Sequence, residues 1–210
     1  MENVNEKLEQ MKKTRKLLWM LSILATVAVL VMLVLFNFMP AARLTVAGTD
    51  KFGNGFSYPG WQLIFYGIGI QYIPGYYEFG FDIITCLGLF VPLIALIVCT
   101  VMSGKGKNKR KAILEFVMAA AILFGGIILF NCRTFAALVA SNKGMNSFRD
   151  AYLNPAIEAG TFDLLTFPKI LLVVCLIAAV VKGLYGAFLL YQRDYAIKHN
   201  VNKKSEDVTN

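Results

Sequence analysis

The stretch from Leu17 to Phe36, LLWMLSILATVAVLVMLVLF, contains no charged residue and decides the class of this protein. An α-helix rises about 1.5 Å per residue, so about 20 apolar residues cross a hydrocarbon core of roughly 30 Å. Three further apolar runs of similar length follow along the chain, at Ile83–Met102, Ala112–Phe130 and Ile170–Tyr191. The sequence therefore predicts an integral membrane protein that crosses the bilayer four times.

Composition points the same way, because 57% of the 210 residues are hydrophobic and only 16% are charged, which is unusual for a soluble domain. The first run follows a basic stretch, as the core of a signal peptide does, but it is longer than the roughly 7 to 15 apolar residues of such a peptide. We therefore predict an uncleaved first span. The expected fold is an all-α membrane protein, a bundle of four transmembrane helices with a small extracellular cap made of a β-hairpin and short helices.

The distribution of Lys and Arg predicts the orientation, because basic residues close to helix ends are retained on the cytoplasmic side. Residues 1–16 hold five of them, 103–111 another five and the tail four, whereas the segments 39–80 and 131–169 together hold six in about 80 residues. We expect a plasma membrane protein with both termini in the cytoplasm. The predicted segments are a cytoplasmic N-terminal segment (1–16), a first span (17–38), an aromatic outer loop (39–82), a second span (83–102), a basic cytoplasmic loop (103–111), a third span with an outer extension (112–140), a second outer loop (141–169), a fourth span (170–191) and a cytoplasmic tail (192–210).

Two segments at the ends of spans invite a finer prediction. Glu and Lys alternate at near-helical spacing over residues 1–16, which suits either a helical extension of the first span or a frayed, solvated lead-in. Residues 112–140 contain no proline, so one helix of about 29 residues would run roughly 43 Å and protrude from the membrane. A short helix is expected in the second outer loop around Phe148–Leu153, before Pro155.

The first outer loop is rich in aromatic residues, since residues 52–81 carry eleven of the chain's 27 aromatic side chains, alternating with glycines. Its β-prone segments, at 43–46 and 56–58, flank a turn-rich stretch and predict a hairpin, and Trp61–Tyr66 is expected to form a short helix along the lipid surface. These rings suit an aromatic belt over a packed cap or a surface that binds a partner. The candidate binding residues are Trp61, Phe65, Tyr66, Tyr72, Tyr76 and Tyr77.

Two ionisable residues interrupt the apolar runs: Glu115 in the third and Lys182 in the fourth. Both fall on the cytoplasmic half of the predicted topology, and a lysine side chain can extend several ångströms towards the interface. We expect an intramembrane ion pair, which either stabilises the bundle or belongs to a proton, ion or substrate relay. Small residues spaced four apart predict close helix contacts, within the bundle or between copies, at Ser22-x-x-x-Thr26, Ala121-x-x-x-Gly125 and Ala179-x-x-x-Gly183.

The residues that usually carry chemistry are sparse. The one histidine, His199, lies in the tail, and the four cysteines show no CxxC spacing, so neither a metal site nor a cofactor is predicted. A disulfide among Cys86, Cys132 and Cys175 stays open, because all three lie towards the predicted outer face. The carboxylates of the outer loops show no paired spacing for acid and base catalysis, and we do not expect an enzyme.

The layout of four spans, inside termini, a long aromatic first outer loop and an extended third helix resembles that of claudin-type tetraspan proteins. The first-loop motif of that family, a Trp followed by Gly-Leu-Trp and two cysteines, is missing, because the loop has the single Trp61 and no cysteine. The resemblance is therefore confined to layout, and the paracellular role of that family is not carried over.

The sequence thus favours a binding or scaffold subunit of the membrane that acts through its aromatic outer loop. The expected partners are membrane lipids, a membrane or envelope protein and a second copy of the chain. Nucleic acid is not expected despite the net charge of +8, because the basic residues flank membrane spans rather than line a soluble reader. The alternative is a small transporter, or a subunit of one, that uses Glu115 and Lys182.

Overall fold

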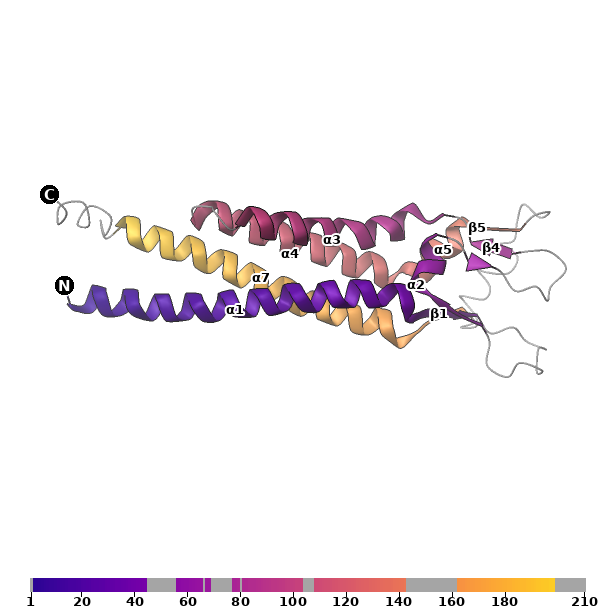
Figure 1. Cartoon of the computed structure of the whole chain (residues 1–210), viewed down its shortest axis with the longest axis horizontal. Helices are drawn as coiled ribbons and strands as arrows, with labels where there is room; N and C mark the ends of the chain where they lie inside the picture. Colours follow the sequence, from indigo (N-terminus) through magenta and orange to yellow (C-terminus); the bar gives the residue numbers. More distant parts are fainter. Residues whose placement is uncertain are drawn as a thin grey trace.

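Long helices dominate this computed structural model, which describes residues 2–44, 56–65, 67–68, 77–79, 81–103, 108–142 and 162–198. They run lengthwise and side by side (Figure 1). Their bounds are Glu2–Phe38 for α1, Ile83–Ser103 for α3, Asn108–Phe130 for α4 and Thr166–Lys198 for α7. All four are long and apolar enough to cross a membrane, which confirms the prediction of four candidate spans.

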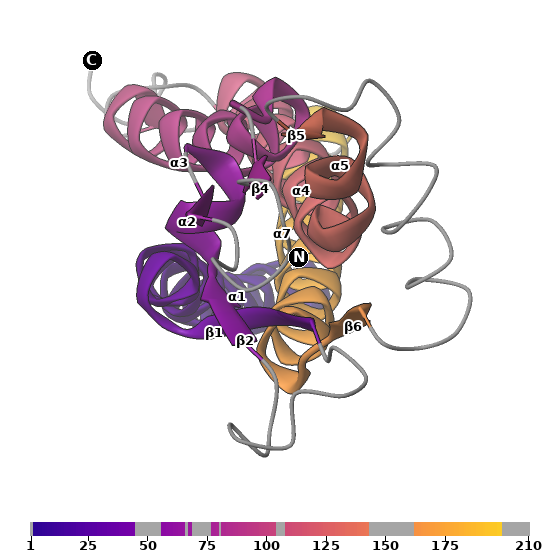
Figure 2. The same cartoon turned by 90° about the vertical axis from the view of Figure 1, so that its right-hand side faces the viewer.

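The bundle is built around α4, which packs against both α3 and α7, whereas α1 packs mainly on α7 and barely touches α3 (Figure 2). Glycines permit the close contacts. A Cβ at Gly125 would lie 2.5 Å from Pro92 Cγ of α3, and one at Gly126 would lie 2.7 Å from Cys175 Cβ of α7. Gly183 differs, because a Cβ there would meet nothing within 4 Å. The predicted small-residue contact is therefore used within the bundle at Gly125 but not at Gly183.

Two helices extend well beyond the apolar runs, because α1 begins at Glu2 and α7 continues to Lys198. The segment 2–16 is thus a helical extension rather than a frayed lead-in. Both extensions lie at the end of the bundle where α3 ends and α4 begins (Figure 1). We call this the basic end, and the opposite end, which carries the strands, the cap end.

The third span differs from the single helix expected over 112–140. It is divided at Asn131, after which α5 (Cys132–Val139) begins and the chain then enters β5 (Ala140–Asn142). The Asn131 side chain donates a hydrogen bond to the carbonyl of Ile127 at 2.8 Å, and asparagine competes in this way with the backbone bonds of a helix. The helix predicted around Phe148–Leu153 lies outside the described residues.

The cap contains two small antiparallel sheets. In the first, β1 (Pro40–Leu44) lies between β2 (Phe56–Pro59) and β6 (Phe162–Leu164), which confirms the predicted hairpin. In the second, β4 (Tyr77–Phe79) lies between β3 (Gly67–Ile68) and β5. Because β1 follows α1 directly and β6 directly precedes α7, the first sheet fixes the cap ends of these two helices to each other.

A short helix, α2 (Gly60–Ile64), fills the space between α1 and α3 at the cap end. Gly60 lies so close to α1 that a Cβ there would be 2.3 Å from the Phe36 carbonyl oxygen. Leu63 and Ile64 are fully buried. A short helix is therefore present where Trp61–Tyr66 was predicted, with bounds Gly60–Ile64; Tyr66 lies outside the described residues, and the inner face of the helix belongs to the protein core.

The first turn of α3 is capped by the buried Asp82. Its carboxylate accepts hydrogen bonds from the backbone N–H groups of Ile84 and Thr85, at 3.0 and 3.1 Å, and from the Thr85 hydroxyl. The backbone N–H of Asp82 in turn donates to the carbonyl of Ile64 at 2.9 Å. Asp82 thus satisfies orphan donors of the helix and joins α2 to α3.

Other contacts in the cap link segments that are far apart in the chain. Arg133 of α5 donates a hydrogen bond to the carbonyl of Phe162 at 2.9 Å and lies 3.8 Å from the Asp163 carboxylate. Burial raises the pKa of Tyr58 and that of Cys132 to about 12 each, so both groups are neutral at physiological pH. All four cysteines, including Cys86, Cys132 and Cys175, carry free thiols in this structure.

Candidate functional site

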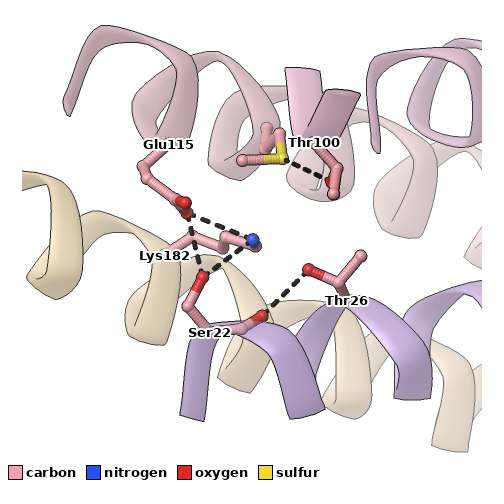
Figure 3. Close-up of polar contacts among 6 residues, drawn as sticks. Ser22, Thr26, Thr100, Glu115 and Lys182 are labelled. Atoms are coloured by element: carbon pink, nitrogen blue, oxygen red, sulfur yellow. Dashed lines mark hydrogen bonds and ion pairs between the residues drawn. The ribbon is translucent and has the colours of Figure 1, made fainter. Parts of the chain in front are cut away.

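Three side chains from three helices meet inside the bundle near its basic end (Figure 3). Lys182 of α7 places its Nζ 3.1 Å from Glu115 Oε2 of α4, and Ser22 of α1 lies between them. Lys182 is only 2% exposed and Glu115 5%. Buried charges are stable only when they are paired and hydrogen-bonded. Here Lys182 and Glu115, the two residues that interrupt the apolar runs, pair with each other.

The Ser22 hydroxyl completes the arrangement. It accepts a hydrogen bond from Lys182 Nζ at 2.8 Å and donates one to Glu115 Oε2 at 3.1 Å. One turn further along α1, the Thr26 hydroxyl donates to the Ser22 carbonyl at 2.9 Å. We call Ser22, Glu115 and Lys182 the polar triad; it couples α1, α4 and α7.

Sequence reasoning treated Ser22 and Thr26 as small residues for helix contact and missed the role of Ser22 as a polar partner. The sequence did contain one signal for this role, which is the position of Ser22 along its apolar run. Ser22 lies about one turn inside the apolar run of α1, close to the level of Glu115 in the third run. A hydroxyl at the same depth as two buried charges is a candidate ligand for both.

A cavity of about 600 Å³ opens beside the polar triad, between α1 and α3, with α4 and α7 as its floor. We call it the basic cavity, because five of its described lining residues are Lys or Arg and one is a carboxylate. Its lining consists of Lys12, Arg15, Lys16, Trp19, Ser22, Ile23, Thr26, Thr100, Ser103, Lys111, Glu115, Met118, Lys182 and Tyr185.

The charges of the basic cavity are unevenly compensated. Glu115 is paired with Lys182, whereas Lys12, Lys16 and Lys111 form no ion pair with any carboxylate in the described part of the chain. Arg15 contacts the side-chain oxygen of Asn108 at 3.4 Å. The mouth of the cavity therefore carries positive charge that the described part of the protein does not neutralise.

The basic cavity does not continue towards the cap end among the described residues. Beyond Thr26 on α1 the inward-facing side chains are Val29 and Leu33, and the corresponding positions of α3 and α4 are Leu96 and Ile122; all four are fully buried in the apolar core. The described cavity is thus bordered by apolar core on the cap side of the polar triad, whereas its lining residues Trp19 and Ile23 are exposed.

The second candidate region is the aromatic segment at the cap end. On α2 and beside it, Trp61 is 43% exposed, Phe65 44% and Phe81 54%, and the Phe65 and Phe81 ring centroids lie 6.2 Å apart. We call these three residues the aromatic edge. Of the other predicted binding residues, Tyr77 lies in β4, whereas Tyr66, Tyr72 and Tyr76 lie outside the described residues.

Comparison of the chain with protein-family models, with curated proteins and with solved structures finds no match. The described residues contain no group of three or more His, Cys, Asp or Glu side chains that could hold a metal ion. What the geometry offers is two binding regions, an aromatic one at the cap end and a cationic one at the basic end.

Proposed function

We propose that this protein is a binding subunit of the plasma membrane that holds a partner protein through its aromatic edge. The basic end would lie in the cytoplasm and the cap outside, as the distribution of Lys and Arg predicts. The observation that carries the proposal is that Trp61, Phe65 and Phe81 present large exposed rings on a support that is itself buried.

The aromatic edge differs from a flexible loop because α2, which carries Trp61, packs tightly on the rest of the protein. Gly60 is pressed against Phe36, and Leu63 and Ile64 are fully buried beneath α2. A rigid anchor loses little conformational entropy on binding, and tryptophan is among the residues that most often dominate the energy of an interface. The aromatic edge therefore has the chemistry and the preorganisation of a binding surface.

Site-specific photo-crosslinking in native membranes tests the proposal. A crosslinker at position 61 is expected to capture one protein partner, and Phe65→Ala in the same chain is expected to lower that yield severalfold. Phe124→Ala is the matched control, because Phe124 is an aromatic residue of similar exposure, 42%, in the middle of α4; it should leave the yield unchanged. Capture of lipid alone at position 61 would mean that the aromatic edge is only a membrane belt.

A small transporter is the second candidate, and the observation that favours it is the cavity beside a buried ion pair. Transport requires a path through the membrane, so the apolar core above the polar triad would have to open. Flux of small ions and metabolites into proteoliposomes should then depend on the triad. If a Glu115→Gln/Lys182→Met double variant retains the flux of the unaltered protein, this candidate function is lost.

A further inference from the structure

We infer that the basic cavity is a binding site for the headgroup of an anionic phospholipid, whose acyl chains leave the cavity between α1 and α3. This site lies at the opposite end of the bundle from the aromatic edge and does not depend on the function proposed for that edge.

The charge of the cavity selects the headgroup. Lys12, Arg15, Lys16 and Lys111 surround its mouth, and the one carboxylate of the described lining, Glu115, is already matched by Lys182 and Ser22. A ligand that enters therefore meets uncompensated positive charge. Basic pockets between transmembrane helices are suited to phosphate-bearing lipid headgroups.

The shape of the bundle favours a lipid over a soluble anion. Because α1 barely touches α3 and the lining residues Trp19, Ile23 and Thr100 are exposed, the cavity is not covered along the seam between these two helices. Ile23 and Met118 line the cavity further from the basic end than Lys12, Lys16 and Lys111, so apolar surface lies beyond the charged mouth, beside the polar triad. The cationic lining followed by apolar lining matches a phospholipid, in which a charged headgroup is followed by acyl chains.

The position of Trp19 fits the same depth. It lines the cavity and is 50% exposed, and it lies one helical turn from Ser22 towards the basic end. Tryptophan is enriched where headgroups meet hydrocarbon. Headgroup binding at the lysines would therefore place the upper part of the acyl chains beside the Trp19 indole.

The two tryptophans of the chain allow a direct test. In a Trp61→Phe variant, Trp19 is the sole tryptophan, and in a Trp19→Phe variant Trp61 reports from the cap end. Each variant of the full chain is placed in nanodiscs of phosphatidylcholine that contain a minor fraction of brominated phosphatidylglycerol or of brominated phosphatidylcholine. We expect phosphatidylglycerol to quench Trp19 more strongly than phosphatidylcholine, and the two lipids to quench Trp61 equally.

Paired lysine variants in the Trp61→Phe background locate the site. Lys16→Gln/Lys111→Gln removes two lysines of the cavity, whereas Lys13→Gln/Lys109→Gln removes two exposed lysines outside its lining, again one from α1 and one from α4. Since each basic residue near an anionic surface contributes a factor of about five to binding, the first pair should lower the preference for phosphatidylglycerol about 25-fold. The second pair should leave it nearly unchanged.

Three results would overturn the inference. Equal quenching of Trp19 by the two lipids would show that the cavity does not select a headgroup, and this comparison holds even if a lysine variant fails to fold. Equal losses in the two lysine pairs would indicate diffuse attraction to the whole basic end. Displacement of brominated phosphatidylglycerol by inorganic phosphate would show that the cavity takes a soluble anion.

Discussion

The two ends of the same bundle are built on opposite principles. At the cap end, glycine contacts, buried apolar side chains and a sheet that fixes α1 to α7 hold the helices together. At the basic end α1 and α3 stand apart, and a charged cavity occupies the space between them. The cap end is closed mainly by packing, whereas the basic end combines a small apolar cluster of Ala112, Tyr185 and Leu189 with the polar triad and a charged cavity.

The comparison indicates where each kind of contact is useful in a membrane. Lipid tails are as apolar as leucine, so helices in a bilayer gain most from close packing and from polar contacts. Close packing at the cap end gives a fixed platform for the aromatic edge. At the basic end the polar triad joins α1, α4 and α7 beside the basic cavity.

Loss of one member of the buried ion pair should give the largest effect. Lys182→Met leaves Glu115 buried without its cation, which is expected to cost about 3 to 5 kcal/mol of stability. The free energy of unfolding in mixed detergent micelles measures it. Glu115→Gln/Lys182→Met removes both charges and should recover most of the loss. A single variant as stable as the double variant would show that the cavity solvates the remaining charge.

The close contact at Gly60 provides the matching test of the cap end. A Cβ there would lie 2.3 Å from the Phe36 carbonyl oxygen and 2.4 Å from its ring, so Gly60→Ala is expected to cost about 1 to 3 kcal/mol through overpacking. Thermal unfolding in detergent measures the change. Gly183→Ala is the control, because its Cβ would meet open space; a loss as large in the control would contradict the packing argument.

Loss of the N-terminal capping residue of α3, Asp82, should lower the stability somewhat less. Asp82→Ala removes the acceptor for the N–H groups of Ile84 and Thr85 and is expected to cost about 1 kcal/mol. Asp82→Asn keeps an acceptor of the same shape and should retain most of the stability. Equilibrium unfolding of the two variants side by side gives the difference, and equal losses would mean that the charge rather than the cap is required.

The smallest effect is expected at Ser22. Ser22→Ala removes two hydrogen bonds but leaves the ion pair, so the expected loss is about 0.5 to 1.5 kcal/mol. Thr14→Ala on the same helix is the control, because the Thr14 hydroxyl bonds only to the Gln10 carbonyl at an exposed position. Unfolding of both variants in one detergent compares them. A larger loss in the control would argue against the triad as a unit.

Features of the fold and the site that depend on neighbouring residues could be predicted from the sequence. Features that depend on contacts between distant parts of the chain could not. The spans follow from local composition, and Glu115 and Lys182 stand out because each is a lone charge in an apolar run. The hairpin is also local. The pairing of β1 with β6 joins residues such as Ala42 and Leu164, and no local pattern indicates such a partner.

Two smaller features were hidden for a different reason. Ser22 reads equally well as a small contact residue or as a polar ligand, and only the position of α1 against α4 and α7 distinguishes these roles. Asn131 lies in an otherwise helical stretch, where one asparagine is a weak signal for a break. In both cases the residue type allowed two local outcomes, and tertiary contacts selected one.

The order of helices along the chain has a consequence for synthesis. The main partner of α1 is α7, the last long helix to leave the ribosome, and the cation that matches Glu115 arrives on that same helix. Before α7 is made, α1 lacks its main helical partner and Glu115 lacks the cation that pairs with it, whereas α3 and α4, which pack on each other, are already present. A chain that ended before α7 would therefore leave the Glu115 carboxylate without the cation that pairs with it.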